Sequence, residues 1–439
     1  MNIFRRAHPW LRVSAVFVLA AALIGATARF PKYFTAENPD GIAATLLTAD
    51  PVGVNHPFFR SLGTNGRTCA TCHVPTEGWS IRAARVRARF NDTQGLDPLF
   101  RPHDGATSPR ADVSTVRARR VAYSLLLSKG LVRIGLPVPD GAEFTLERTD
   151  DPYGFASASE LSLFRRPLPS TNLAFLSTVM WDGRETFPDR SMMFNLRRQA
   201  NTATVGHAEG GPLDAAVRQA IARFELRLFT AQVRDQEARS LTGAGAGGGP
   251  RVLATQPYYP GINSSEDPTG TPPTARAFTL FDAWATAAGD NAEPRQAIAR
   301  GQALFNTKTF TARASTCTSC HNAPNAGSNS TALLFDIGVT AERRRTPDLP
   351  LYTLRCVSGA RAGQRRVTTD PGLALISGRC ADIGKFKVPV LRGLAARPPY
   401  FHNGSAATLD DVVTFYDLHF RIGFTAAERA DLAAFLRAL

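Results

Sequence analysis

The sequence predicts a mainly α-helical protein with extensive loops, organised as two halves around two copies of one short motif. The motif is Cys-x-x-Cys-His, and it stands at Cys69–His73 and again at Cys317–His321. Apolar residues near helical spacing predict helices in both halves. The 35 glycines and 30 prolines among 439 residues predict many turns and loops between them.

The Cys-x-x-Cys-His spacing is typical of covalent attachment of c-type haem. Two thiols can form thioethers with the haem vinyl groups, and the adjacent histidine can then ligate the iron. A zinc site or a thioredoxin-like dithiol is the alternative, but no βαβ pattern surrounds either copy and both carry the histidine. We therefore expect two covalently bound haem c groups in two cytochrome c-like domains, attached through Cys69, Cys72, Cys317 and Cys320 and ligated by His73 and His321.

Residues 1–28 read as a signal peptide. Three arginines precede an apolar run from Val13 to Ile24, and Ala26-Thr27-Ala28 offers a cleavage site. The run is short for a membrane span, which needs roughly 20 apolar residues. We expect a cleaved signal and a periplasmic protein, with a membrane association only if the signal stays uncleaved.

Two cysteines remain outside the motifs, Cys356 and Cys380. In an oxidising compartment two such thiols indicate a disulfide, and unpaired buried thiols are the alternative. The formal net charge is +14. Nucleic-acid binding does not suit an exported protein, so the surplus arginines are expected to pair with haem propionates, to steer an acidic partner or simply to face solvent.

The first haem domain is expected over residues 29–240. It begins with a turn-rich lead-in to residue 60, has loops or a short hairpin over 134–160, a helical stretch ending at Arg198, and a long amphipathic helix over 213–239. Residues 241–275, rich in Gly and Pro, are expected to link the two halves.

The second haem domain is expected over residues 276–439. Residues 296–305 read as a helix, and 322–380 read as mostly irregular. Thr408 with Asp411, and Thr425 with Glu428, have the spacing of helix N-terminal caps, so each pair predicts the start of a helix.

Four separate stretches together resemble the bacterial di-haem cytochrome c peroxidase and MauG superfamily. They are Cys69–His73, Trp181-Asp-Gly-Arg184, Cys317–His321 and the tail Phe386–Tyr416, which contains Phe-Lys-Val-Pro-Val-Leu-Arg and Pro-Tyr-Phe-His-Asn-Gly-Ser. The insertions at 91–160 and 240–275 are not covered well by this resemblance.

The resemblance implies a division of labour between the two haems. Hydrogen peroxide would react at the N-terminal haem, held by His73, and electrons would arrive from the C-terminal haem, held by His321. Trp181 would lie between the haems. The electron donor would be a small redox protein, such as a cytochrome c or a cupredoxin.

The second ligand of the C-terminal haem is expected to be Tyr416. The peroxidases use a methionine on the helix after the Pro-Tyr-Phe-His turn, but the four methionines here all lie in the N-terminal half, at 1, 180, 192 and 193. Tyr416 stands at the matching position, fourteen residues after His402, where MauG has a tyrosine. His402 and His419 are the alternatives. A hard oxygen ligand should lower the haem potential.

The residues on the open side of the N-terminal haem are expected to be Gln199 and Glu209. Family members place a glutamine and, ten residues later, a glutamate after the Trp-Asp-Gly-Arg block, and this chain keeps that separation but farther from Trp181. Glu209 would act as the general acid–base, with His207 as a competing candidate. No histidine lies between His73 and His103, so we expect no histidine to cap this haem at rest. The resemblance is also compatible with a calcium ion bound between the two domains.

These observations favour an exported di-haem peroxidase that reduces hydrogen peroxide. One alternative is MauG-like oxidation of a protein substrate, which the absence of a C-terminal methionine favours chemically. A second is a non-catalytic di-haem electron-transfer cytochrome, which would leave Gln199 and Glu209 without a purpose. A third is an oxygenase on the same fold, because fold does not fix function.

Overall fold

The computed structural model describes residues 29–311 and 315–439, and the expected signal peptide lies outside them. The fold is mixed α/β and not mainly α, because helices make up about 33% of it and strands 16% in several small sheets. The extra strands pair segments that lie far apart in the sequence, so their hydrogen-bonding partners are not visible in local periodicity.

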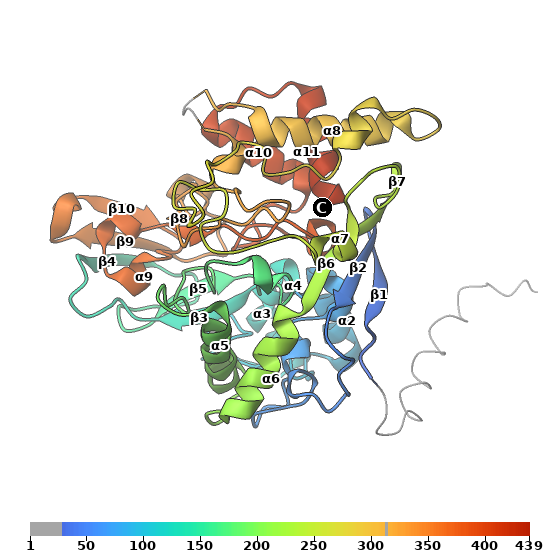
Figure 1. The fold of residues 1–439 in the computed structure, drawn as a ribbon. Helices are drawn as coiled ribbons and strands as arrows, with labels where there is room; N and C mark the ends of the chain where they lie inside the picture. The colour runs from blue at the N-terminus through green and yellow to red at the C-terminus, as the bar shows by residue number, and fades with distance from the viewer. Residues whose placement is uncertain (1–28, 312–314) are drawn as a thin grey trace, which may run out of the picture.

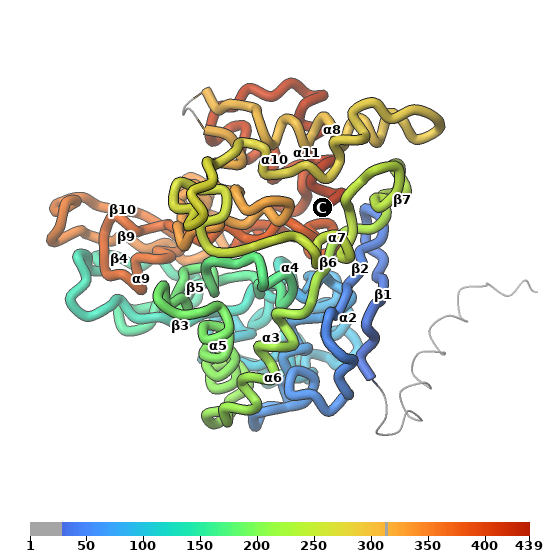
Figure 2. Tube along the Cα trace, in the orientation of Figure 1, coloured from blue at the N-terminus to red at the C-terminus, as the bar shows by residue number. Residues whose placement is uncertain are grey.

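The largest sheet has the strand order β1-β2-β6-β7 and joins the start of the described chain to its middle. Strands β1 (Tyr33–Asn38) and β2 (Gly41–Leu47) form a hairpin, and β2 pairs antiparallel with β6 (Leu228–Asp235). Figure 2 shows these segments side by side. The helix expected over 213–239 is therefore only α6 (Ala215–Leu226), after which the apolar and β-branched residues of β6 enter the sheet.

The N-terminal half also contains helices that surround the first Cys-x-x-Cys-His motif. Helix α5 (Met192–His207) packs beside α6, and both lie away from the C-terminal helices in Figure 1. The other helices of this half are short: α2 (Ala83–Thr93), α3 (Val116–Ala122) and α4 (Ser124–Lys129). The helix expected to end at Arg198 instead runs on to His207, which brings His207 to the end of α5.

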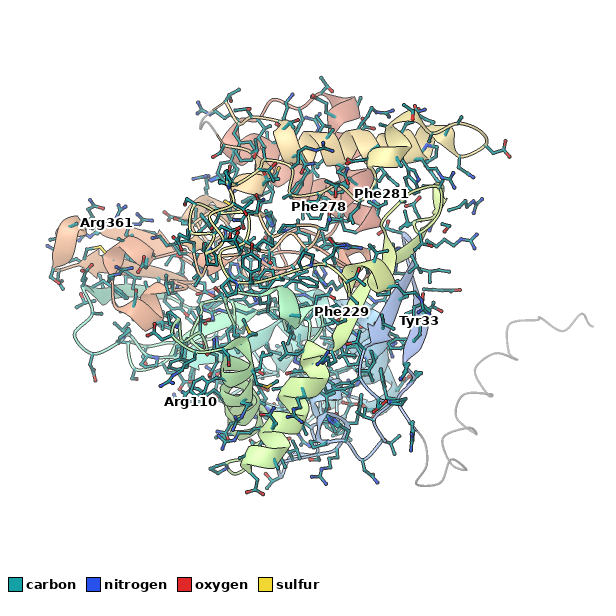
Figure 3. The ribbon with its side chains drawn as sticks, viewed as in Figure 1. Tyr33, Arg110, Phe229, Phe278, Phe281 and Arg361 are labelled. Carbon is teal, nitrogen blue, oxygen red and sulfur yellow. A yellow bond between two sulfur atoms is a disulfide. The ribbon has the colours of Figure 1, made fainter. Side chains whose placement is uncertain are left out.

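A side lobe is built from both halves of the chain. Strand β4 (Phe144–Asp150) pairs with β9 (Leu351–Cys356), which pairs with β10 (Arg365–Thr368). The disulfide Cys356–Cys380 ties β9 to the segment after the short helix α9 (Ala374–Ser377), so the predicted disulfide is confirmed. The lobe projects from the body in Figure 1, and Figure 3 shows Arg361 at its outer end. Residues 322–380 are thus less irregular than expected.

Two more strand pairs complete the sheets. Strand β3 (Val132–Leu136) pairs with β5 (Leu161–Arg165), and β8 (Leu334–Phe335) pairs with β11 (Phe386–Lys387). Strand β7 (Arg239–Ser240) adds the edge of the large sheet. The pair β8–β11 holds Phe386 and Lys387, at the start of the tail, against the segment that follows the second motif.

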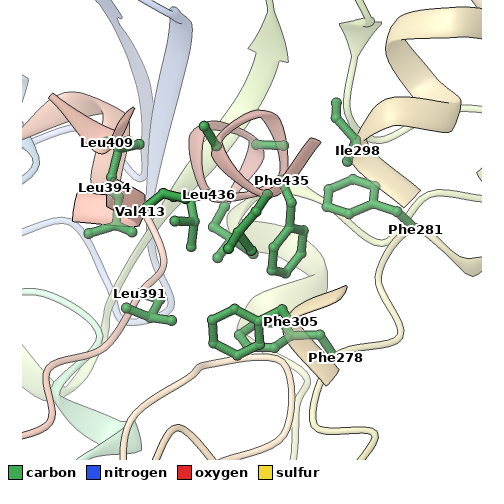
Figure 4. Packing of buried hydrophobic residues seen from close by; sticks show 14 of the residues in the cluster. Phe278, Phe281, Ile298, Phe305, Leu391, Leu394, Leu409, Val413, Phe435 and Leu436 are labelled. Carbon is green, nitrogen blue, oxygen red and sulfur yellow. The ribbon is translucent and has the colours of Figure 1, made fainter. Parts of the chain in front are cut away.

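Three helices make the C-terminal core. Helix α8 (Ala292–Thr307) packs on α11 (Ala426–Ala438), and α10 (Leu409–Phe420) also packs on α11. The predicted caps Thr408–Asp411 and Thr425–Glu428 are confirmed as capping boxes. Figure 4 shows the buried apolar cluster between these helices, which includes Phe278, Phe281, Phe305, Phe435 and Leu436.

The Gly/Pro-rich stretch between the halves packs against the body. It contains helix α7 (Gly249–Leu253), and Leu241 and Leu253 are fully buried. Burial of these two leucines anchors a stretch whose composition alone predicts a flexible linker. Within the described residues, no helix combines the length and the apolar character needed to cross a membrane.

Candidate active site: two cavities at the Cys-x-x-Cys-His motifs

The first motif forms a compact turn that presents its two thiols and its imidazole together. A 3-10 turn covers Cys69–Thr71, with a capping box between Thr68 and Thr71. The backbone N–H of His73 donates to the carbonyl of Cys69 over 3.0 Å. The ring Nδ1 of His73 lies 3.2 Å from the carbonyl oxygen of Trp79. A hydrogen bond at Nδ1 fixes the ring and leaves Nε2 as the ligating nitrogen.

The second motif repeats this geometry. Residues Cys317–Ser319 form the same turn with the same kind of capping box, here between Thr316 and Ser319. The Nδ1 of His321 lies 2.5 Å from the carbonyl oxygen of Gly327. Gly327 has φ +74°, and a Cβ there would meet Phe278 and Leu391 within 3 Å, so a glycine is needed to present this carbonyl. Both histidines are therefore oriented in the same way.

Each motif lies on the wall of a large cavity. Cavity 1 contains Cys69, Cys72 and His73 and encloses about 1500 Å³, including its opening to solvent. Cavity 2 contains Cys317, Cys320 and His321 and encloses about 1530 Å³ on the same measure. Burial lowers the pKa of both histidines to about 4, so both rings are neutral at neutral pH. Paired thiols, a neutral oriented imidazole and a large apolar cavity fit covalently bound haem at both motifs.

Trp181 lies on the walls of both cavities. Its indole Nε1–H donates to the carbonyl of Arg166 over 2.8 Å, and its own carbonyl accepts from the backbone N–H of Lys387 over 2.9 Å. Its ring lies edge to face with that of His402, with centroids 6.1 Å apart. Trp181 therefore contributes to the wall of each cavity that contains a motif.

A buried ion network holds the segment around Trp181. Asp182 is fully buried and contacts the Arg165 guanidinium at 2.5 Å, and Arg165 also contacts Asp370 at 2.7 Å. Arg184 adds a second contact to Asp182 at 3.0 Å. Breaking such a buried pair leaves an uncompensated charge, which costs several kcal/mol. Sequence reasoning did not find Arg165 and Asp370, because neither lies in a recognisable motif beside the block.

Three residues were expected on the open side of the N-terminal haem, and only two of them line cavity 1. Gln199 and His207, both on α5, line cavity 1, whereas Glu209 does not line it and is exposed. Glu209 follows the end of α5 in a left-handed backbone conformation with φ +53°. The structure therefore brings Gln199 and His207 together at the cavity and leaves Glu209 outside its wall.

Three further charged residues line cavity 1 that sequence reasoning missed. Asp104 and Glu225 are buried acids, and Lys387 is a buried base that also lines cavity 2. Burial raises the pKa of Glu225 to about 7 and lowers that of Lys387 to about 7. The Lys387 ammonium donates to the carbonyl of Thr178 over 2.8 Å. Glu225 and Lys387 are charged residues between apolar ones, which was a signal of burial, whereas Asp104 lies between His103 and Gly105 and had no such signal.

Tyr416 and His402 both line cavity 2 together with His321. The Tyr416 hydroxyl has no hydrogen-bond partner among the described residues, and burial near Cys320 and Cys317 raises its pKa. His402 is buried, stacks on Phe386 with centroids 4.0 Å apart, and its Nε2 has no hydrogen-bond partner in the described part of the chain. His419 does not line either cavity and contacts Arg343 instead. Tyr416 and His402 thus remain the residues available to cavity 2.

Asn172 precedes the Trp-Asp-Gly-Arg block, in the region where the resemblance would place a calcium ligand. Both polar atoms of the Asn172 amide are hydrogen-bonded to the backbone of Thr230, each over 2.8 Å. Residues 29–311 and 315–439 contain no cluster of three His, Cys, Asp or Glu side chains arranged to hold a metal ion.

Comparison with known proteins gives relatives of one kind. The chain is 34% identical over 179 residues to the cytochrome-c peroxidase IdrP1 of Denitromonas iodatirespirans, a match that covers 36% of this chain and 44% of the relative. It is 32% identical over 160 residues to the cytochrome c551 peroxidase of Nitrosomonas europaea, covering 36% and 38%. The matched residues thus resemble those of bacterial cytochrome c peroxidases, in agreement with the resemblance that the sequence motifs indicated. The matched part of the chain spans less than half the length of each of these two relatives.

Two other comparisons are weaker. A MauG-like protein associated with microbial copper homeostasis aligns over 65% of this chain and 77% of its own chain, at 17% identity and a TM-score of 0.36. No family model matches the chain.

Proposed function

We propose that this protein is an exported di-haem c-type peroxidase that reduces hydrogen peroxide. The observation that carries the proposal is that Trp181 lines two cavities, each of which contains its own Cys-x-x-Cys-His motif. The curated relatives are named cytochrome-c peroxidases, which supports the same reaction. Cavity 1 is the peroxide site, and cavity 2 receives electrons.

Two cytochrome c-like domains, residues 29–240 and 276–439, each hold one haem c, and residues 241–275 join them. When bound, each haem supplies an iron that exchanges electrons. The chain supplies the rest: His73 and His321 are held by backbone carbonyls in the orientation needed for ligation. Trp181 packs between the two sites with its indole N–H anchored to Arg166. An aromatic ring in this position shortens the path for electrons between the sites.

The electron donor is a small redox protein, a cytochrome c or a cupredoxin, that is acidic at its contact surface. The formal charge of +14 supports this choice, because opposite charge steers association. Export is supported by the N-terminal pattern and by the Cys356–Cys380 disulfide, since disulfides persist in oxidising compartments such as the periplasm. The intact mass of the protein purified from a periplasmic fraction would show whether residues 1–28 are removed.

The test uses the holoprotein with both motifs intact. The haem content is measured by the pyridine haemochrome method in the wild type and in Cys69→Ala/Cys72→Ala and Cys317→Ala/Cys320→Ala variants. We expect two haems in the wild type and one in each double variant, with peroxide-driven oxidation of a reduced donor lost in both variants. Electron paramagnetic resonance is then recorded before and after one equivalent of peroxide. Two low-spin haems that do not respond to peroxide would leave a simple electron carrier.

MauG-like oxidation of a protein substrate is the second candidate function. The Tyr416 hydroxyl on the wall of cavity 2, and the absence of methionine from the C-terminal half, favour it. An oxygen ligand stabilises oxidised iron relative to a thioether. This function predicts that peroxide oxidises the resting protein without prior reduction. The oxidised protein should then return to its resting state faster with a protein that exposes tyrosine or tryptophan than with a small redox donor.

A further inference from the structure

A buried carboxylate lies beside cavity 1 and contacts three basic side chains. Asp104 is 4% exposed and lines the cavity. Its Oδ2 lies 2.7 Å from Nδ1 of His207, 2.6 Å from the Arg67 guanidinium and 3.3 Å from Nε2 of His103. Its Oδ1 has no hydrogen-bond partner among the described residues. These partners hold the buried carboxylate in place, and two of them, Arg67 and His207, also line the cavity.

His207 is fixed in place from two sides. It is the last residue of α5, and its carbonyl accepts hydrogen bonds from Asn65 over 2.9 Å and from Arg67 over 3.0 Å. Its ring Nδ1 is bonded to Asp104. Its Nε2 has no hydrogen-bond partner within residues 29–311 and 315–439, and the side chain is 40% exposed. One nitrogen is therefore occupied, and the other is available on the wall of cavity 1.

The charge of Asp104 persists at neutral pH. Burial alone would raise the pKa of its carboxyl, but the contact with His103, the hydrogen bond with His207 and the charge of Arg67 hold that pKa well below its usual range. An anionic acceptor at Nδ1 keeps the proton on that nitrogen, makes Nε2 the basic one and stabilises the ring when it becomes cationic. This is the role that the aspartate has in a Ser-His-Asp triad.

Glu209 contacts the same group of residues only from outside. Its carboxylate lies 3.3 Å from Nδ1 of His103, its side chain is 49% exposed, and it does not line the cavity. The chain of contacts from Glu209 through His103 to Asp104 leads from solvent to the buried carboxylate. Glu209 is thus located to exchange protons with water, whereas His207 is located to exchange them with a molecule in cavity 1.

We propose that His207 is the group that transfers the proton of peroxide in cavity 1 and that Asp104 is its positioning residue, with His103 and Glu209 connecting the pair to solvent. This inference rests on the proposed peroxidase function. Nε2 of His207 takes the proton from one peroxide oxygen and returns it to the other, which leaves as water when the O–O bond breaks. Two electrons from a reduced redox protein and two protons from solvent complete the balance, H₂O₂ + 2 H⁺ + 2 e⁻ → 2 H₂O.

The test compares two ligands of the ferric holoprotein as well as turnover. Hydrogen cyanide must lose a proton to bind, whereas imidazole binds as the neutral molecule, so only cyanide needs a base in the cavity. Association of each is followed by stopped-flow absorbance. For His207→Gln we expect the rate constants for peroxide and for cyanide to fall about 10²- to 10⁴-fold, the usual worth of a general acid–base. The imidazole rate constant should stay within about threefold, because no proton moves.

Two further variants separate positioning from chemistry. Asp104→Asn keeps the shape but removes the charge, and it should slow peroxide and cyanide at least about tenfold without changing imidazole. Glu209→Gln should cost less than about tenfold, since the carboxylate acts only through His103. His56→Gln is the matched control, because His56 contacts Phe59 and Phe224 and does not line cavity 1.

Three outcomes overturn the inference. The first is a loss of a hundredfold or more in Glu209→Gln with His207→Gln within threefold of wild type. The second is an equal change of cyanide and imidazole in His207→Gln, which means that the cavity is distorted. The third is an Asp104→Asn variant that folds, as judged by its thermal transition, and behaves as wild type. If Asp104→Asn does not fold, His207→Gln still decides. If the wild type does not reduce peroxide, the peroxidase proposal fails. The rate constant for cyanide association in His207→Gln then still shows whether His207 acts as a base in cavity 1.

Discussion

The rings of Trp181 and His402 lie edge to face with their centroids 6.1 Å apart, and both side chains line cavity 2. His402 in turn stacks on Phe386 at 4.0 Å, and Trp181 alone of the three also lines cavity 1. The three rings form one packed group next to Lys387, whose backbone N–H is bonded to the carbonyl of Trp181. A change to the Trp181 ring should therefore affect communication between the cavities more than the formation of either.

Trp181→Phe tests this directly. Phenylalanine keeps most of the packing but loses the hydrogen bond to the carbonyl of Arg166, so the stability loss should be about 1 kcal/mol. We expect two haems to remain and the rate of donor oxidation by peroxide to fall about tenfold or more, because electron transfer between the sites slows. The rate is measured with a reduced donor under single turnover. Trp284→Phe is the matched control, because Trp284 is buried in the C-terminal core away from both cavities.

Tyr416→Phe should change the spectrum of one haem and little else. The Tyr416 hydroxyl has no hydrogen-bond partner among the described residues, so its removal should cost less than about 1 kcal/mol of stability. If Tyr416 is the second ligand at cavity 2, the low-spin resonance changes and the potential of that haem rises. Tyr400→Phe is the control, because Tyr400 lines the same cavity but donates to the carbonyl of Leu394. Identical spectra for wild type and Tyr416→Phe would exclude the tyrosine ligand and direct attention to His402.

Features that depend only on residues close together in the sequence, or on counting residues of one type, were predictable from the sequence. The two motif turns, the caps at Thr408 and Thr425, and the disulfide each depend on spacing or on counting. The strands of the side lobe were missed because Phe144 pairs with Cys356, more than 200 positions away. The same distance in sequence hid the Arg165–Asp370 pair, and Asp104 became interpretable only when the fold brought it to the end of α5.

The disulfide should stabilise the side lobe without affecting the cavities. Cys356 and Cys380 are 24 residues apart, both are buried, and neither lines a cavity. Cross-linking a loop of this length contributes about 3 kcal/mol by restricting the unfolded chain. We expect Cys356→Ala/Cys380→Ala to lower the urea midpoint by a corresponding amount and to leave the haem spectra unchanged. A change in either haem spectrum would show instead that the lobe is coupled to a cavity.

Glu225 should make the stability of the protein depend on pH near neutrality. It is buried on the wall of cavity 1, one carboxylate oxygen has no hydrogen-bond partner in the described part of the chain, and burial raises its pKa to about 7. A group whose folded pKa is raised stabilises the fold fully below its unfolded pKa, near 4.3, and this contribution is lost as the pH rises towards 7. The contribution of Glu225 to stability should therefore be smaller at pH 8 than at pH 5.

The variant Glu225→Gln removes this dependence, because the amide does not ionise. We expect the free energy of unfolding of the variant to exceed that of the wild type at pH 8, by at most about 4 kcal/mol, with the advantage shrinking towards pH 5. Urea unfolding at the two pH values measures the difference. Glu237→Gln, an exposed position, is the control and should give the same difference between pH 5 and pH 8 as the wild type. A variant less stable than wild type at pH 8 would show that Glu225 is ionised and paired in the folded protein.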